Sequence, residues 1–405
     1  MATTTAEIRR HNAFSIIRSI HAAGDVSRRD LSGSTDLSFP AVSAICQDLL
    51  GGSLIVEVSR ERSEVGRPSG RLSLNPDLGF LIGVDIAETY VLAVSFDTSL
   101  SKVSETLRPM DTHSRRPDDV IQATKDVVLA EISRHLQSRL LGVGVSAPGI
   151  VDSVGGTSVF APNWGWRDVP LLKLLAESIS CPIRLDNPLK ALAIAEIWNH
   201  PSRIEQTFAV VNLGTGVGAG LAIEGQVFRG RTNSAGEWGH TVIVADGREC
   251  RCGSRGCVEA YVGAPGILET LRETHPTSEL LCGDNQVTTI GNLAAAIATK
   301  DQVAMDVLER TAHFLGIALA TLVNVINPDA VIVTGWVASQ LGQPLVDAAR
   351  PHLHSHALAV PMDASSLEFY PSTDNAVALG MAASALENYL EANAKPGMAV
   401  KDKNW

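Results

Sequence analysis

Residues 239–259 read GHTVIVADGRECRCGSRGCVE, and this stretch decides how the second half of the chain must fold. It brings together one imidazole and three thiols, those of His240, Cys250, Cys252 and Cys257. Sulfur and nitrogen donors at such short spacing are typical of a tetrahedral zinc site, and the interspersed glycines allow the tight turns that direct them inward. The stretch therefore predicts a closed, structural Zn²⁺ site.

Two other interpretations of these cysteines fit the sequence less well. A disulfide framework is typical of short secreted chains, whereas this chain has 405 residues, six cysteines and no secretory signal segment. Three core cysteines on a glycine-rich loop are the second alternative, but Arg248, Glu249, Arg251 and Arg255 make the loop too charged for a core. We expect a reducing, cytoplasmic location.

Length and charge limit the architecture further. A chain of 405 residues with 45% hydrophobic content can bury more than one core, which favours two or three domains. No apolar run approaches the roughly 18 residues of a membrane span, so no membrane partner is expected. The net charge is −11, but residues 1–76 carry +1 and the remainder carries −12. The acidity therefore lies outside the first 76 residues.

The first 76 residues have the pattern of a small DNA-binding domain. Apolar spacing and capping residues predict helices over 8–22, 27–31 and 38–50. Two short strands follow, 54–58 and 71–74, joined by an arginine-bearing tip. Three helices followed by a basic hairpin predict a winged helix-turn-helix over residues 1–76, whose third helix enters the major groove.

Five side chains in this domain are candidate DNA contacts. Ser38, Ser43 and Gln47 on the third helix can hydrogen-bond to base edges or phosphates. Arg67 and Arg71 flank the wing tip and can enter a narrow minor groove. The alternative is a protein-interaction module, because the third helix carries no lysine or arginine. We favour DNA binding.

From Gly79 onward, strands and helices alternate, which predicts an α/β fold. The chain contains the following motifs in this order: Ala147-Pro148-Gly149, Pro162-Asn163, Asp186-Asn187, Leu213-Gly214-Thr215-Gly216-Val217-Gly218, Gly236-Glu237-Trp238-Gly239-His240 and the three cysteines followed by Glu259. In this order they resemble the ROK family of sugar kinases, open reading frames and repressors. With a winged helix in front, the chain is similar to the repressors that respond to xylose, glucose or N-acetylglucosamine.

The resemblance implies a fold and a ligand site. It implies a two-lobed, actin-like ATPase (sugar kinase) fold over residues 77–395, with one lobe formed by 77–186 plus a C-terminal helix near 375–392. The other lobe is 187–374 and holds the zinc loop. The resemblance assigns contacts with sugar hydroxyls to the following side chains: Asn163, Asn187, Glu237, His240 and Glu259. Carboxylates and amides suit such contacts, whereas the alternative is an ordinary hydrogen-bonded interface.

Departures from the family's kinases favour a regulator over an enzyme. Kinases of the family carry two glycines in the first phosphate turn, where this chain has Ala87-Glu88, and an aspartate as general base, where it has Pro188. Proline cannot accept a proton. Trp336 also stands where a second glycine is usual. We therefore expect no catalytic activity.

The resulting prediction is a sugar-responsive transcriptional repressor that binds operator DNA as a homodimer or homotetramer. Its effector is a small sugar or sugar derivative. One alternative is a ROK sugar kinase with an appended DNA-binding head. Another is an adaptor that binds a protein partner through its acidic surface.

Overall fold

The computed structural model describes residues 5–35, 37–58, 70–110, 115–373 and 375–393. By its internal contacts the chain divides into two compact units. Unit 1 comprises residues 1–160, 166–204 and 377–405, and unit 2 comprises residues 161–165 and 205–376. Among the described residues, no helix is long and apolar enough to cross a membrane.

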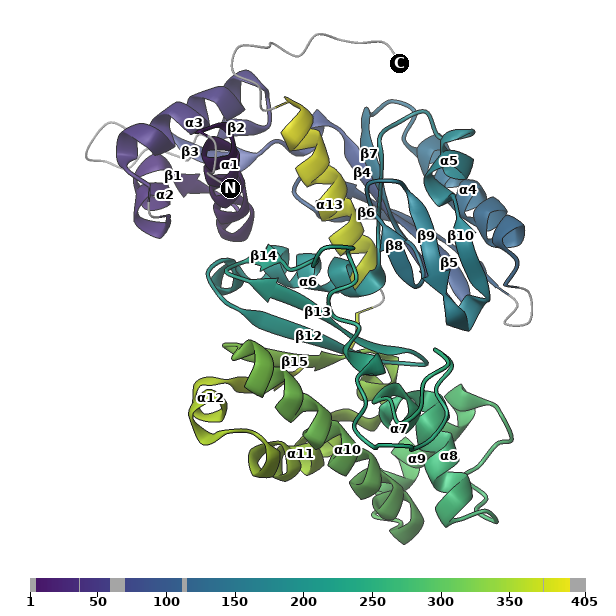
Figure 1. Ribbon diagram of the computed structural model, residues 1–405. Helices are drawn as coiled ribbons and strands as arrows, with labels where there is room; N and C mark the ends of the chain where they lie inside the picture. Colours follow the sequence, from purple (N-terminus) through teal and green to yellow (C-terminus); the bar gives the residue numbers. More distant parts are fainter. Residues whose placement is uncertain (1–4, 36, 59–69, 111–114, 374, 394–405) are drawn as a thin grey trace. The chain divides into compact units, whose positions relative to one another are not determined.

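Unit 1 begins with a winged helix, which we call the head (Figure 1). Its elements are α1 (Thr5–Ala23), β1 (Val26–Ser27), α2 (Arg28–Ser34), α3 (Phe39–Gly51), β2 (Ile55–Val58) and β3 (Arg71–Leu74). Ser27 and Asp30 form a reciprocal capping box at the start of α2, as the sequence predicts. The strand order is β1-β3-β2, so the hairpin gains a two-residue third strand that the sequence pattern did not indicate.

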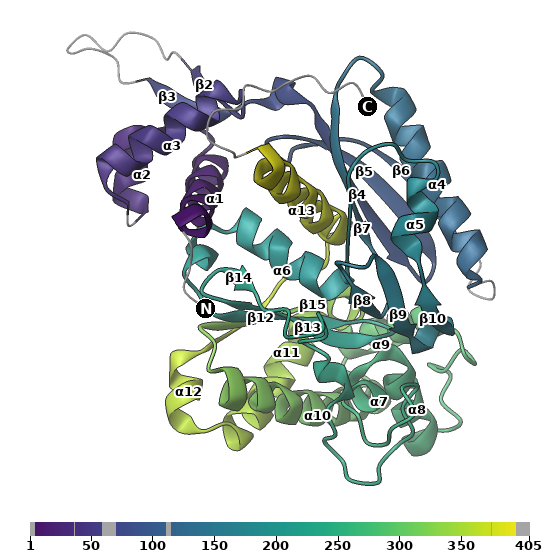
Figure 2. The same cartoon turned by 45° about the horizontal axis from the view of Figure 1, so that its top comes forward.

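The rest of unit 1 is built on a five-stranded sheet of order β11-β7-β4-β5-β6. Its strands are β4 (Phe80–Ala87), β5 (Tyr90–Asp97), β6 (Lys102–Pro109), β7 (Leu140–Ser146) and β11 (Ile183–Asp186). Helix α4 (Pro117–Arg134) covers one face, and α13 (Ala376–Asn393) lies on the other with α6 (Pro188–Asn199) beside it (Figure 2). The smaller elements are η1 (Pro76–Leu78), β8 (Ile150–Asp152), β9 (Thr157–Ala161), β10 (Trp166–Val169), α5 (Leu171–Ala176) and η3 (Pro201–Ile204).

Helix α13 approaches its neighbours at backbone distance because glycines stand at the contacts. A Cβ at Gly83 of β4 would overlap the carbonyl of Ala378, and one at Gly144 of β7 would overlap the carbonyl of Met381. On the other side of the helix, a Cβ at Gly380 would overlap the carbonyl of Ala191 in α6. Helix α13, the last helix among the described residues, is therefore held tightly between the sheet and α6.

Unit 2 repeats the same sheet plan. Its strand order is β14-β13-β12-β15-β16. Strands β12, β15 and β16 run parallel, as β4, β7 and β11 do in unit 1. Strands β12, β13 and β14 are antiparallel, as β4, β5 and β6 are in unit 1. The strands are β12 (Phe208–Leu213), β13 (Val217–Ile223), β14 (Gln226–Val227), β15 (Ala330–Thr334) and β16 (Ser366–Phe369). The helical elements are η2 (Pro162–Trp164), η4 (Trp238–His240), α7 (Glu259–Val262), α8 (Ala264–Thr274), α9 (Gln286–Ala298), α10 (Gln302–Ile326), α11 (Trp336–His356) and α12 (Ala359–Ala364). The core lies between sheet and helices, and α10 contributes most to it, as its apolar period predicts.

The sequence placed the boundary between the lobes at residue 187. Contacts instead assign residues 166–204, and with them α6, to unit 1. The reason is the close packing of α6 on α13, which the local sequence does not reveal.

The packing of α13 yields a first prediction. Gly144→Ala forces the new methyl group against the Met381 carbonyl, so we expect a loss of roughly 2 kcal/mol or more in the free energy of unfolding. Gly142 on the same strand is the matched control, because a Cβ there would lie 3.5 Å from the Ala385 Cβ, an ordinary contact. Gly142→Ala should change stability by less than about 1 kcal/mol. Urea unfolding measures both, and equal midpoints for the two variants would contradict the packing argument.

Candidate metal centre and effector-site residues

The exposed surface of the third helix of the head is mixed: it includes Phe39, Ala44, Gln47 and Asp48, and Asp48 pairs with Arg9. Ser38 and Gln47 are exposed and Ser43 is half-buried, while Val42, Ile45, Cys46 and Leu49 pack inward. Arg71 is engaged within the head, because its Nη2 donates to the Asp25 carbonyl at 2.7 Å and to the Asp25 carboxylate at 3.1 Å. Arg67 lies outside the described residues.

In unit 2, the four predicted metal ligands converge. One ligand atom from each of His240, Cys250, Cys252 and Cys257 lies within 4.8 Å of all the others. The distance from His240 Nδ1 to Cys250 Sγ is 3.6 Å, and the distance from Cys252 Sγ to Cys257 Sγ is 3.8 Å. A tetrahedral zinc with Zn–S bonds of about 2.3 Å needs sulfurs about 3.8 Å apart. The donor set therefore fits a closed tetrahedral site.

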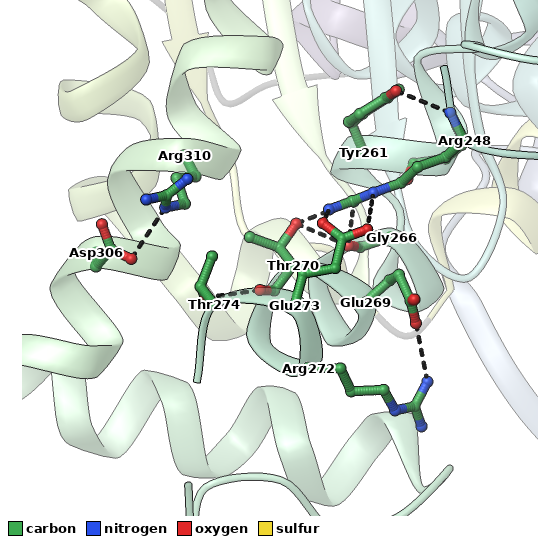
Figure 3. Close-up of polar contacts among 11 residues, drawn as sticks. Arg248, Tyr261, Gly266, Glu269, Thr270, Arg272, Glu273, Thr274, Asp306 and Arg310 are labelled. Atoms are coloured by element: carbon green, nitrogen blue, oxygen red, sulfur yellow. Dashed lines mark hydrogen bonds and ion pairs between the residues drawn. The ribbon is translucent and has the colours of Figure 1, made fainter. Parts of the chain in front are cut away.

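Backbone turns and one arginine hold this loop in place. Gly256 has a φ of +77°, and a Cβ there would overlap the Val244 carbonyl, so only glycine fits. The Arg248 guanidinium reaches α8, where Nη1 donates to the Gly266 carbonyl at 2.9 Å and to Thr270 Oγ1 at 3.0 Å (Figure 3). It also pairs with Glu273 and lies 4.9 Å from the Tyr261 ring centroid. Sequence reasoning treated Arg248 only as a charge that argued against a core.

Glu259 links the metal loop to the glycine-rich turn between β12 and β13. Its Oε2 accepts from the Val217 amide at 3.0 Å, and its Oε1 lies 3.4 Å from Arg251 Nη2 and 3.9 Å from Cys250 Sγ. A Cβ at Gly216 would lie 3.5 Å from both Glu259 Oε2 and Asn163 Nδ2. The structure therefore brings together three of the predicted sugar contacts, Asn163, Glu259 and, through Cys250, His240. Arg251, which orients this carboxylate, was missed as a functional residue.

Glu237 and Asn187 are placed differently. Glu237 is half-buried at the N-terminus of η4, three residues before His240, whose amide donates to the Glu237 carbonyl at 3.0 Å. Asn187 belongs to unit 1 and caps α6, because its Oδ1 accepts from the Leu189 amide at 2.8 Å and the Lys190 amide at 3.3 Å. Its Nδ2 donates to the Gly149 carbonyl at 3.1 Å.

Three strands of unit 1 end in polar side chains. Asp85, Ser146 and Asp186 are opposite one another in the register of β4, β7 and β11, and all three are buried. Burial raises the pKa of Asp85 to about 6, although the Tyr90 hydroxyl donates to the carboxylate. Asp186 Oδ1 accepts from the Asn187 amide at 2.9 Å, and Pro188 follows as the first residue of α6.

Glu88 and Trp336, which we expected to differ from the kinase pattern, each contact other residues of their own unit. Glu88 Oε2 lies 3.0 Å from Arg115 Nη2. In unit 2, a Cβ at Gly214 would lie 3.2 Å from Trp336 Cδ1, so the indole packs on the glycine-rich turn. Within that turn the Gly214 amide donates to the Gly216 carbonyl at 3.1 Å.

Comparisons with known proteins agree with this architecture. The model of the ROK family matches residues 81–388. The chain is 27% identical over 394 residues to the xylose repressor of Bacillus spizizenii, a match that covers 95% of this chain and 97% of the repressor. It is 31% identical over 303 residues to the glucokinase of Halalkalibacterium halodurans, which covers 72% of this chain and 90% of the glucokinase.

A solved structure extends the likeness to the whole fold. A ROK family transcriptional regulator, a homologue of the Escherichia coli Mlc protein, matches with a TM-score of 0.78 at 24% identity and covers 95% of this chain and 98% of its own. The predicted winged helix followed by a two-lobed, actin-like sugar kinase fold is therefore confirmed. Both repressors and glucokinases are relatives of the chain.

The geometry of the thiol cluster yields a second prediction. The purified protein should carry about one zinc per chain, because three thiolates and one imidazole complete a tetrahedron. Cys252→Ser should lose the metal in a chelator wash that leaves it in Cys282→Ser, whose thiol is 3.3 Å from Asn292 Nδ2 and outside the cluster. Elemental analysis measures both. Equal zinc content in the two variants would show that the cluster does not hold the metal.

Proposed function

The chain belongs to the ROK family, and on that premise we propose that it is a sugar-responsive transcriptional regulator that represses genes of carbohydrate uptake or catabolism. The observation that carries the proposal is the head, whose described residues form three helices and three strands with exposed residues on α3, in front of the family domain. The likeness to a xylose repressor runs through the head as well as the domain and supports the same conclusion. In this role Ser38, Ser43 and Gln47 of α3 contact base edges or phosphates of operator DNA.

The wing completes DNA binding in this proposal. Arg67 reaches the minor groove or a phosphate, and Arg71 contributes mainly by fixing the hairpin to Asp25, the pair described above. A head of +1 net charge on a body of −12 binds DNA weakly by itself. A symmetric homodimer or homotetramer places two heads on paired half-sites and supplies the missing affinity. The protein acts in the cytoplasm, where its operator lies.

Zinc in unit 2 has a structural role in this proposal. A Zn²⁺ bound by His240, Cys250, Cys252 and Cys257 would have no open coordination position, so it would supply rigidity and no chemistry. The loop then fixes Glu259, which the Val217 amide and Arg251 orient from two other directions. Sugar hydroxyls donate to carboxylates held in this way at lower entropic cost than to free side chains. The proposed sugar contacts in unit 2 are Asn163, Glu237, His240 and Glu259. The proposed sugar contact in unit 1 is Asn187.

The alternative function, a sugar kinase with an appended head, is disfavoured by residues that phosphoryl transfer needs. Pro188 offers no base, and the Asp186 carboxylate accepts from the neighbouring Asn187 amide. In the glycine-rich turn, the Gly214 amide already donates a hydrogen bond to the Gly216 carbonyl, and the Val217 amide donates one to Glu259. These two amides are therefore not available to bind a phosphate. The glucokinase relative keeps the kinase alternative worth testing.

A third prediction tests DNA and sugar together. Gln47→Ala should weaken binding to the selected operator by on the order of tenfold, since one base contact contributes about 1–3 kcal/mol. Gln137→Ala, which changes another exposed glutamine that lies outside the head, should leave operator binding unchanged.

The same assay tests the sugar response. D-xylose or D-glucose should shift operator affinity in the wild type, and Glu237→Gln should abolish that shift because its sugar contact is weakened. Fluorescence anisotropy on fragments selected by the full chain measures each effect, and a wild type that selects no DNA would overturn the proposal.

A fourth prediction concerns catalysis. The wild type should show no turnover of D-glucose or D-xylose with ATP and Mg²⁺ in a coupled assay, because it has neither a base nor a free phosphate turn. Rates of about 1 per second, ordinary for kinases, would return the kinase alternative to first place. In that event Asp186→Asn should abolish turnover.

A further inference from the structure

The head is anchored to the rest of unit 1 by a specific polar junction. Glu387, on α13, accepts two hydrogen bonds at Oε1: one from Arg18 Nη2 on α1, at 2.7 Å, and one from the Trp198 indole on α6, at 3.1 Å. The Arg18 guanidinium lies 5.8 Å from the Trp198 ring centroid, and the His21 ring meets the same indole edge-on at 5.3 Å. Three helices, one of them from the head, therefore share one carboxylate.

The burial of these groups shows that the junction is more than a surface contact. Trp198 is 1% exposed, and the Arg18 side chain is 9% exposed although it belongs to the first helix of the head. A guanidinium is costly to bury unless a charged partner and hydrogen bonds compensate it. Glu387 supplies the charge and one charge-assisted hydrogen bond, at Nη2, whereas the buried Arg18 Nε has no hydrogen-bond partner among the described residues. The pairing therefore fixes one position of α1 on α6 and α13.

A second contact fixes the other side of the head. Thr98, in the turn between β5 and β6, is 2% exposed and donates its hydroxyl to the Asn75 carbonyl just after β3. Burial lowers the pKa of His21, while a backbone hydrogen bond to Ser99, the charge of Asp97 and a backbone hydrogen bond to Trp198 oppose the shift. The anchored head still leaves Ser38 and Gln47 of α3 exposed. The anchored position is therefore compatible with DNA binding.

Helix α6 connects this junction with a proposed effector contact. Asn187 caps its first turn, and Trp198 lies in its last turn. Helix α6 approaches α13 at backbone distance at one point, Ala191 against Gly380, and can pivot there as a rigid element. A displacement of about 1–2 Å, common in switching proteins, is enough to separate the Trp198 indole from Glu387.

We propose that the junction of Arg18, Trp198 and Glu387 is the switch through which the effector controls DNA affinity. Heads anchored at the junction are in the operator-binding arrangement, and effector binding releases them by moving α6. This inference rests on the proposed function, since it assigns the route by which sugar and operator are coupled. Anchoring raises operator affinity because it holds two heads of an assembly at one spacing and so raises their effective concentration at paired half-sites.

The test is a double-mutant cycle in the full chain. Glu387→Gln and Arg18→Gln should each weaken sugar-free operator binding by roughly tenfold, through the loss of effective concentration. The double variant should be no weaker than either single variant, because both remove the same contact. Glu391→Gln, one turn further along α13 and exposed, is the matched control and should bind as the wild type does. Affinity for unrelated DNA should stay unchanged in all four, since α3 is intact.

The effector response gives the second readout. D-xylose and D-glucose are the probes, and the active one should change operator affinity less in Glu387→Gln than in the wild type, because the heads are already released. Hydrogen exchange over residues 5–23 should rise in the variant and, with the sugar, in the wild type. Wild-type operator affinity together with a full sugar response in Glu387→Gln would overturn the proposal while leaving the proposed function intact.

Other experimental results would show that the proposed function itself is wrong. A wild type that selects no DNA overturns both the function and the inference. A wild type that binds DNA but responds to neither sugar removes the effector from the proposal, and sugar-free operator affinity in Glu387→Gln then decides whether the junction controls the heads.

Discussion

The close packing of α13 is the constraint on which the rest of unit 1 depends. A helix can lie against a sheet at backbone distance only where side chains are absent, and Gly83, Gly144 and Gly380 provide three such places. Helix α13 thereby covers the five-stranded sheet of unit 1, whose first strand in the chain is β4. It also carries Glu387 to α1, so the position of the head follows from the packing of a helix that lies nearly 370 residues later in the sequence.

Unit 2 is organised around a polar centre. The thiol and imidazole cluster, the Glu259 carboxylate and the glycine-rich turn are joined through short contacts. Arg248 holds the outer part of the loop on α8, and Arg251 holds Glu259. A bound metal would tighten an arrangement that already has its hydrogen bonds.

The relation to sugar kinases is visible in the two sheets and in the glycine-rich turn. The two sheets repeat one strand order, and the strands of unit 1 still end in buried polar side chains. The amides of the glycine-rich turn now donate to a carbonyl and to Glu259, and the Trp336 indole packs against Gly214. Pairing of these amides within unit 2 avoids the cost of leaving buried polar groups unsatisfied.

The sequence by itself determined the local features, and only the tertiary structure decided how they combine. Some features depend only on neighbours in the chain, so pattern and residue type were enough to predict them. They are the helix cap of Ser27 with Asp30, the apolar period of α10 and the spacing of His240, Cys250, Cys252 and Cys257. The bond between Arg71 and Asp25 was not predicted, and α6, which the sequence placed in the second lobe, packs with the first. The roles of Arg248, Trp198 and Glu387 were invisible in the sequence, because each depends on partners that are distant in the chain and meet only through packing.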